Sequence, residues 1–221
     1  MKETILIVGI NGSLGKEIEK YYKTHDSYEV FGTTSNKKVT KNVFLLDFLN
    51  TKTIKNFKNL SINHLIVASG YEPKYNLKEI NKEHLNKMFD IHVAGPILLL
   101  QKIQNNFKKN SSITFISSPA AQQGSYDPSY SAVKGATNSL VRTLAKDLAP
   151  NIRVNAFSPS LIKDSTVYNG MSNDFKEKHK NNTLNKRLLL LDECVNAIDF
   201  IIKNKHFTGQ ILHLNGGMIY G

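Results

Sequence analysis

The fold of this chain is decided near its start, by the stretch Ile5-Leu6-Ile7-Val8-Gly9-Ile10-Asn11-Gly12-Ser13-Leu14-Gly15. The run of branched apolar residues predicts a buried strand over 5–9, and the pattern over 14–22 predicts a helix. Between them, the glycines have G-x-x-G-x-x-G spacing. Such glycines allow a tight turn and let a pyrophosphate approach the free N–H groups at the start of a helix. The stretch therefore predicts a dinucleotide site, and a merely structural turn is the alternative.

The rest of the chain continues this alternation. Strands are predicted at 29–32, 43–46, 64–68, 112–117, 153–157 and 210–214, and helices at 51–60, 83–104, 129–148 and 192–203. Alternation at this spacing predicts a doubly wound α/β fold, a parallel sheet with helices on both faces, in a single domain over 1–221. The polar stretch 162–187 is irregular, and it is either a disordered insertion or a flexible loop that folds over a ligand.

Composition limits the partners that we expect. The net charge is +11, but the lysines are scattered in pairs such as Lys37-Lys38 and Lys108-Lys109, so we expect a basic surface and no nucleic-acid partner. No apolar run is long enough to cross a bilayer, so we expect no membrane partner. The single Cys194 cannot form an internal disulfide, which favours the cytoplasm. No cluster of His, Cys and carboxylates has metal-site spacing.

The end of the second predicted strand bears on the choice of dinucleotide. It reads Phe31-Gly32-Thr33-Thr34-Ser35-Asn36-Lys37-Lys38. An acidic residue here would hold the ribose hydroxyls of NAD, and none is present. Hydroxyls and two lysines suit a 2′-phosphate better, so the segment predicts NADP, with NAD and an ordinary polar loop as alternatives.

A candidate acid/base pair lies in Tyr130-Ser131-Ala132-Val133-Lys134, with Ser117-Ser118 upstream. Residues four apart share one face of a helix, so the phenol and the ammonium can point to the same place. A nearby cation favours the phenolate and lowers the pKa of the tyrosine. Roughly one Tyr-x-x-x-Lys is expected by chance in this chain, so the pair needs support from other motifs.

Those motifs together resemble the short-chain dehydrogenase/reductase family, in its compact branch, over essentially the whole length. Besides the glycine loop, the resemblance rests on Leu46-Asp47-Phe48, on Ser118 with Tyr130 and Lys134, on Ile152-Arg153-Val154-Asn155-Ala156 leading to Pro159, on Thr208-Gly209-Gln210 and on Asn215-Gly216-Gly217. The resemblance implies a Rossmann-like oxidoreductase that uses NADP(H) to interconvert a carbonyl and an alcohol. It also implies a homodimer or homotetramer.

The resemblance assigns roles to individual residues. Ser118 would hold the carbonyl oxygen, Tyr130 would exchange a proton with it, and Lys134 would hold the nicotinamide ribose and lower the Tyr130 pKa. Asp47 and the Phe48 backbone would bind adenine. The remaining cofactor contacts would come from Gly9, Asn11, Gly12, Ser13, Leu14, Gly15, Thr34, Ser35, Ala68, Ser69, Gly70, Tyr130, Lys134, Pro159 and, through its backbone to the carboxamide, Ile162.

The chain also departs from the family pattern. His92 replaces an asparagine that supports a proton relay, and it is either a hydrogen-bonding catalytic residue or a packed helix residue. Val67-Ala68-Ser69-Gly70 replaces Asn-Asn-Ala-Gly. Asp164 falls where a threonine usually touches the cofactor, and Ser165 or Thr166 could substitute. Ser117 is the alternative to Ser118, because successive side chains on a strand face opposite ways.

Two further expectations concern function. The segment 163–187 has three more lysines and arginines than acidic residues, so a lid formed by it would favour an anionic substrate. The altered residues at 67–70 and His92 raise an alternative, a catalytically weak or inactive regulator that senses the cofactor. The intact Ser118, Tyr130 and Lys134 favour the enzyme.

Overall fold

The computed structural model describes residues 2–36, 39–55, 57, 60–219 of the chain. Its strands form one parallel sheet in the order β3-β2-β1-β4-β5-β6-β7. The strands are β1 Glu3–Val8, β2 Tyr28–Thr34, β3 Val43–Leu45, β4 Ile62–Val67, β5 Phe107–Ile116, β6 Ile152–Pro159 and β7 Ile211–Leu214. The strand order reverses direction between β1 and β4, and a crevice opens there at the carboxyl ends of the two strands. The predicted doubly wound fold is confirmed.

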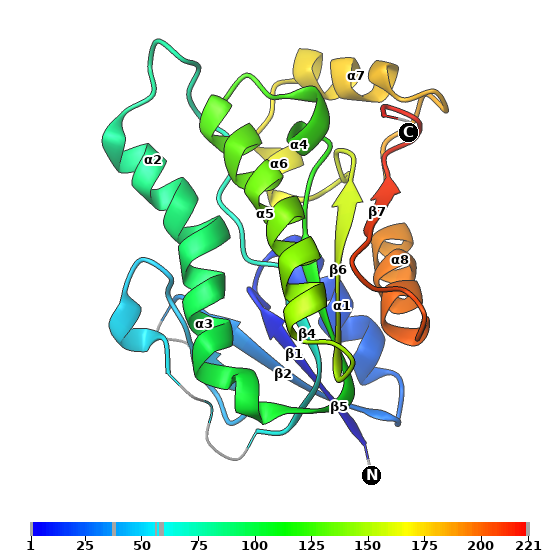
Figure 1. Ribbon diagram of the computed structural model, residues 1–221. Helices are drawn as coiled ribbons and strands as arrows, with labels where there is room; N and C mark the ends of the chain where they lie inside the picture. The colour runs from blue at the N-terminus through cyan, green and yellow to red at the C-terminus, as the bar shows by residue number, and fades with distance from the viewer. Residues whose placement is uncertain (1, 37–38, 56, 58–59, 220–221) are drawn as a thin grey trace.

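Helices cover both faces of the sheet (Figure 1). On one face, α3 (Gly95–Ile103) and α5 (Pro128–Asp147) bury Leu99, Ile103 and Val141 against the strands. On the other, α1 (Ser13–Lys23) and α8 (Leu191–Lys203) bury apolar side chains of their own against the strands. Since both faces are covered, the central strands are apolar on both sides, as the near-continuous run at the start of the chain predicts.

The remaining helices are short and lie in the connections. They are η1 Thr51–Thr53, α2 Lys82–Phe89, η2 Asp90–Ala94, η3 Gln104–Asn106, α4 Ala120–Gln123, α6 Thr166–Asn169 and α7 Asn173–Asn182. Figure 1 shows α4, α6 and α7 beyond the carboxyl ends of β6 and β7. These helices therefore border the end of the sheet at which the crevice opens.

The helix predicted over 51–60 is wrong. Among the described residues of this stretch only η1 is helical, and the Thr53 hydroxyl ties it to the carbonyls of Asp47 and Asn50. Ile54, Phe57 and Leu60 are buried in the core below, although the backbone that carries them is not helical. Apolar residues three apart imitate a helical face, and here an irregular segment inserts them instead.

Two other expectations need correction. The segment 162–187 is neither disordered nor a plain loop, because it contains α6 and α7, capped by the Ser165 and Ser172 side chains. The helix predicted over 83–104 is interrupted by the π-helical turn η2, which carries His92. Such turns occur frequently at functional sites.

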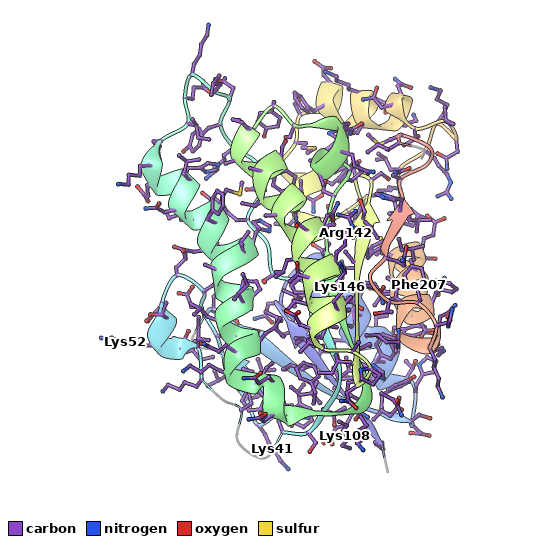
Figure 2. The ribbon with its side chains drawn as sticks, in the orientation of Figure 1. Lys41, Lys52, Lys108, Arg142, Lys146 and Phe207 are labelled. Atoms are coloured by element: carbon purple, nitrogen blue, oxygen red, sulfur yellow. The ribbon has the colours of Figure 1, made fainter. Side chains whose placement is uncertain are left out.

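The positive charge is spread over the surface. Figure 2 labels Lys52 on η1, Arg142 and Lys146 on α5, and Lys41 and Lys108 near the amino ends of β3 and β5. None of these five cations lines the crevice at the carboxyl ends. In the described part of the chain, no helix is long and apolar enough to traverse a bilayer.

Candidate active site

The glycine loop joins β1 to α1 and leaves space that a larger residue would fill. Gly9 has φ +86°, and a Cβ atom there would lie 2.8 Å from the backbone nitrogen of Ser69. A Cβ on Gly15 would collide with the Gly9 carbonyl. No side chain caps the start of α1, so its N–H groups remain available to an anion. The loop fits a pyrophosphate.

A cavity of about 780 Å³ extends from this loop across the carboxyl ends of the strands. A volume of this size suits a ligand of several rings. Most of the predicted site residues line it: Gly9, Asn11, Gly12, Ser13, Leu14, Gly15, Thr34, Ser35, Ala68, Ser69, Gly70, His92, Ser118, Tyr130, Lys134, Pro159 and Ile162. The Ser69 hydroxyl is buried without a hydrogen-bond partner in the described residues, which leaves it available to a ligand.

Asp47 and Phe48 do not line this cavity. The Asp47 carboxylate accepts a hydrogen bond from the Leu49 backbone, and the Phe48 ring is buried against Gly95. Their adenine contact stays a prediction. Lys37 and Lys38, which favoured NADP, lie outside the described residues.

The three candidate catalytic side chains meet in the cavity. Ser118 follows β5, while Tyr130 and Lys134 come from the first turns of α5. The Ser118 and Tyr130 side chains both line the cavity, and the Ser118 hydroxyl lies near enough to the phenol to lower its pKa. The Lys134 Nζ lies 5.5 Å from the centre of the Tyr130 ring and donates to the Ile116 carbonyl over 2.8 Å. This arrangement can bind an oxygen atom and exchange a proton with it.

The neighbouring Ser117 has a different partner. Its hydroxyl is buried and donates to the Asn138 side chain over 2.6 Å. Both serines follow the end of β5 and line the cavity, but the Ser117 hydroxyl is already committed to Asn138. The geometry therefore favours Ser118 over Ser117.

The pKa of Tyr130 departs from the expectation. Burial raises it above its ordinary value, although the nearby Ser118 hydroxyl opposes the rise. Lys134 does not lower it here, because burial lowers the pKa of Lys134 itself to about 7. A lysine that is only partly protonated provides a weaker field than the full charge assumed from the sequence.

His92 is buried beside the tyrosine. Its ring centre lies 6.1 Å from that of Tyr130, and its Nε2 lies 3.0 Å from both the Tyr71 nitrogen and the Tyr71 carbonyl oxygen. Burial, followed by the charge of Lys134, lowers the pKa of His92 to about 3. Neutral imidazole at physiological pH favours a hydrogen-bonding role over proton storage. A catalytic role for His92 stays a prediction.

The sequence suggested a lid in the segment 162–187, but not that part of it is helical or which of its side chains face the cavity. In α7, Phe175, Lys178, His179 and Asn182 line the cavity at helical spacing i, i+3, i+4 and i+7. That spacing could have identified them if 162–187 had been predicted as helical. The lid also touches the glycine loop, because Thr166 hydrogen-bonds the Ser13 hydroxyl through both its hydroxyl and its backbone nitrogen, each over 2.9 Å.

A second part of the wall comes from the segment after β4, and its residues beyond Gly70 were missed. Tyr71, Glu72 and Pro73 line the cavity there. Within the described ranges, no three His, Cys, Asp or Glu side chains come close enough to hold a metal ion.

Comparison with known proteins places this geometry in a family. A family model described as Enoyl-(Acyl carrier protein) reductase matches residues 46–219. An uncharacterized oxidoreductase of Bacillus subtilis is 33% identical over 162 residues, which cover 71% of this chain and 66% of that protein. The 3-oxoacyl-[acyl-carrier-protein] reductase of Buchnera aphidicola subsp. Baizongia pistaciae is 30% identical over 245 aligned positions, covering 98% of this chain and 97% of the relative.

Solved structures share the whole fold. A short chain dehydrogenase family protein from Francisella tularensis superposes with a TM-score of 0.89 at 23% identity, covering 99% of both chains. A small-chain dehydrogenase in complex with NADPH gives a TM-score of 0.87 at 24% identity and covers both chains fully, at 100% each. With the family model matched over most of its length, the chain belongs to the short-chain dehydrogenase/reductase family of oxidoreductases.

Proposed function

We propose that this protein is an NADP-preferring oxidoreductase that interconverts a carbonyl and an alcohol, with Tyr130 as the general acid and base. The observation that carries the proposal is the convergence of Ser118, Tyr130 and Lys134, with Lys134 Nζ 5.5 Å from the centre of the tyrosine ring, in the cavity that begins at the glycine loop. The cofactor supplies or accepts a hydride.

The protein side chains handle the oxygen and its proton. Ser118 donates a hydrogen bond to the substrate oxygen and orients it. Tyr130 gives its proton to that oxygen in reduction and takes it back in oxidation. Because burial raises the Tyr130 pKa, the phenol holds its proton at neutral pH before reduction. Negative charge brought by a nucleotide favours the protonated form of Lys134, which in turn favours the phenolate that reduction leaves behind.

The preference for NADP rests on the end of β2. Thr34 and Ser35 line the cavity, and the Asn11 side chain donates to the Thr34 hydroxyl over 2.8 Å. No carboxylate from this loop competes with a phosphate. The test is the ratio of kcat/KM for NADPH and NADH, which we expect to favour NADPH by at least about tenfold. Equal values or a preference for NADH would contradict the proposal.

The substrate that suits the lid is anionic. Lys178 and His179 line the cavity from α7, while Glu72 is the acidic residue among the described residues that line it. Lys176, two residues before Lys178, instead packs over the Tyr168 ring at 4.5 Å and does not line the cavity. The structure thus separates two lysines that the sequence treats alike.

Tyrosine replacement tests the chemistry. Tyr130→Phe keeps the ring and removes the hydroxyl that would transfer the proton. We therefore expect turnover to fall by about 10³-fold while NADPH affinity changes little. The probes are acetoacetate and methyl acetoacetate with NADPH, followed at the nicotinamide absorbance. Wild-type protein that binds NADPH but reduces neither probe, nor any carbonyl of a wider panel, would favour the alternative of a cofactor-sensing regulator.

The two lysines test the substrate charge. We expect wild-type protein to prefer acetoacetate to its uncharged methyl ester, and Lys178→Glu to remove that preference by raising KM for acetoacetate about tenfold. Lys176→Glu is the matched control on the same helix, and it should alter KM less than about twofold. Equal effects of the two variants would contradict a role for the cavity side of α7.

Assembly and location remain proposals as well. Exposed apolar side chains on α2 and α3, namely Leu85, Phe89, Ile97 and Leu98, support a homodimer or homotetramer. Light scattering on the purified protein decides the number of subunits. The free, buried Cys194 thiol is compatible with the proposed cytoplasmic location.

A further inference from the structure

A histidine and an aspartate form a buried pair just outside the cavity. The His84 Nε2 of α2 lies 2.7 Å from the Asp127 Oδ2, and the two side chains are 1% and 0% exposed. Neither residue lines the cavity. A buried carboxylate is costly unless it is fully hydrogen-bonded, so the pair calls for an explanation.

The Asp127 carboxylate has three donors on each oxygen. Oδ1 accepts from the Ser129 and Tyr130 backbone nitrogens and from the Ser129 hydroxyl. Oδ2 accepts from the Lys74 and Tyr75 backbone nitrogens and from His84. Burial alone would raise the Asp127 pKa, but these donors hold it at about 2. Since the ionised carboxylate only accepts, His84 must donate from Nε2.

The Asp127 Oδ1 and its three donors fix the first turn of α5. Asp127 is its N-cap, and Tyr130 lies in the first turn, with its backbone nitrogen 3.2 Å from Oδ1. A shift of this turn would displace the phenol from Ser118. Positions of this kind matter because a misplacement of about 1 Å can lower a rate about 100-fold.

The other carboxylate oxygen of Asp127, Oδ2, holds the cavity wall. It binds Lys74 and Tyr75, directly after the lining residues 71–73. The Tyr126 hydroxyl donates to the Pro73 carbonyl over 2.8 Å, and His92 contacts the Tyr71 backbone. One carboxylate therefore ties the wall to the helix that carries Tyr130.

His84 completes the connection. Its ring packs against Tyr71 and Tyr75, with ring centres 5.3 and 4.8 Å away. Its Nδ1 has no hydrogen-bond partner in the part of the chain that the structure describes, which fits a tautomer protonated on Nε2. The helix α2 thus reaches both the wall and the Asp127 carboxylate through a single side chain.

Capping alone does not require this arrangement. The helices α6 and α7 are capped by Ser165 and Ser172, each with one backbone nitrogen as its partner. A serine would likewise cap α5, with no histidine and no contact to the wall. The additional donors on Asp127 serve the wall segment, which the other caps do not touch.

We propose that Asp127 and His84 are positioning residues that hold Tyr130 and the wall segment 71–75 in one fixed relation. Asp127 joins the two elements, and His84 keeps the second carboxylate oxygen in place. This proposal rests on the proposed function, because the position of Tyr130 matters only if it transfers a proton.

Four variants distinguish the contact of Asp127 with α5 from its contact with the wall segment 71–75. Asp127→Ser keeps a cap and removes the contact with the wall, so we expect kcat for acetoacetate with NADPH to fall about 30- to 100-fold while KM for NADPH stays within about threefold. His84→Phe keeps the ring and removes the donor, with an expected loss of about tenfold in kcat. His84→Gln restores a donor at a similar distance and should return kcat to within about threefold of wild type. Tyr22→Phe, which removes a donor to Asp199 on α8, is the control for a lost buried hydrogen bond away from the cavity.

The outcomes decide the proposal. It is supported if His84→Gln rescues kcat while Tyr22→Phe leaves kcat unchanged. It is overturned if Asp127→Ser keeps kcat within about twofold, or if His84→Gln and His84→Phe lose the same amount.

A second measurement does not depend on turnover. We expect His84→Phe, and not His84→Gln, to speed amide hydrogen exchange at both Tyr130 and Lys74–Tyr75. If wild-type protein has no turnover, the proposed function fails and this exchange still tests the connection. Faster exchange in only one of the two segments, or in neither, overturns the connection.

Discussion

The two ends of the sheet carry similar residues and differ in what surrounds them. At the amino end, Ser112, His64 and Glu3 form a chain on three neighbouring strands, with His64 Nδ1 2.8 Å from the serine hydroxyl and Nε2 3.2 Å from the Glu3 carboxylate. These are the residue types of a hydrolytic triad. At the carboxyl end, Ser118 and Tyr130 lie in an open cavity.

The surroundings of each group of side chains decide its role. Ser112 is 0% exposed and lines no part of the cavity, so no substrate can reach its hydroxyl. The amino-end chain satisfies buried polar groups between strands. At the carboxyl end, the glycine loop and the lid border an open cavity of about 780 Å³. Three predictions test whether function is confined to that end.

The largest effect is expected at Gly9. An alanine there would place a Cβ atom 2.8 Å from the Ser69 backbone, where φ is +86°. Strain and overpacking each cost about 1–3 kcal/mol, so NADPH affinity measured by fluorescence titration should fall at least about 100-fold. Gly209→Ala is the control, because its φ is +70° but the nearest atom lies 3.6 Å away. Equal NADPH affinity of the two variants would show that the loop does not hold the nucleotide.

An intermediate effect is expected from the buried Lys134. Its pKa is about 7 in the folded protein and near 10.5 in the unfolded chain. The unfolded chain therefore holds more protons between these values, and stability rises with pH across this window. Below pH 7 the burial cost is fully present. Urea unfolding should find Lys134→Met more stable than wild type at pH 6, by on the order of a few kcal/mol, with the difference shrinking towards pH 10.

The same pH dependence tests whether the buried Lys134 carries a full charge. A difference in stability that stays constant from pH 6 to pH 10 would show that Lys134 is charged throughout. Tyr130 would then experience the full cation that the sequence suggested.

The smallest effect on activity is expected at the amino end. Ser112→Ala removes the hydroxyl that contacts His64, so stability should fall by about 1–3 kcal/mol while kcat changes less than about twofold. Ser118→Ala is the contrasting variant, with an expected loss of about 100-fold in kcat for acetoacetate with NADPH. A large kcat loss in Ser112→Ala, at unchanged folding, would contradict the division between the ends.

Much of the fold was predictable because local patterns and the sheet agree. The strand, glycine loop and helix at the start, and the alternation that follows, predicted the doubly wound architecture, and every predicted site residue except Asp47 and Phe48 lines the cavity. The helix predicted over 51–60 failed because buried residues three apart do not require a helical backbone. Periodicity reports which residues are buried and not how the chain reaches them.

The doubly wound fold, the glycine loop and the spacing of Ser118, Tyr130 and Lys134 can be read from the chain, because they depend on local patterns along one or two elements. Three features depend on packing instead: which lysine of α7 faces the cavity, the effect of burial on the pKa values of Tyr130 and Lys134, and the contact between His84 and Asp127. Burial and contact between distant segments depend on how the elements pack, and spacing along the chain does not encode these distances.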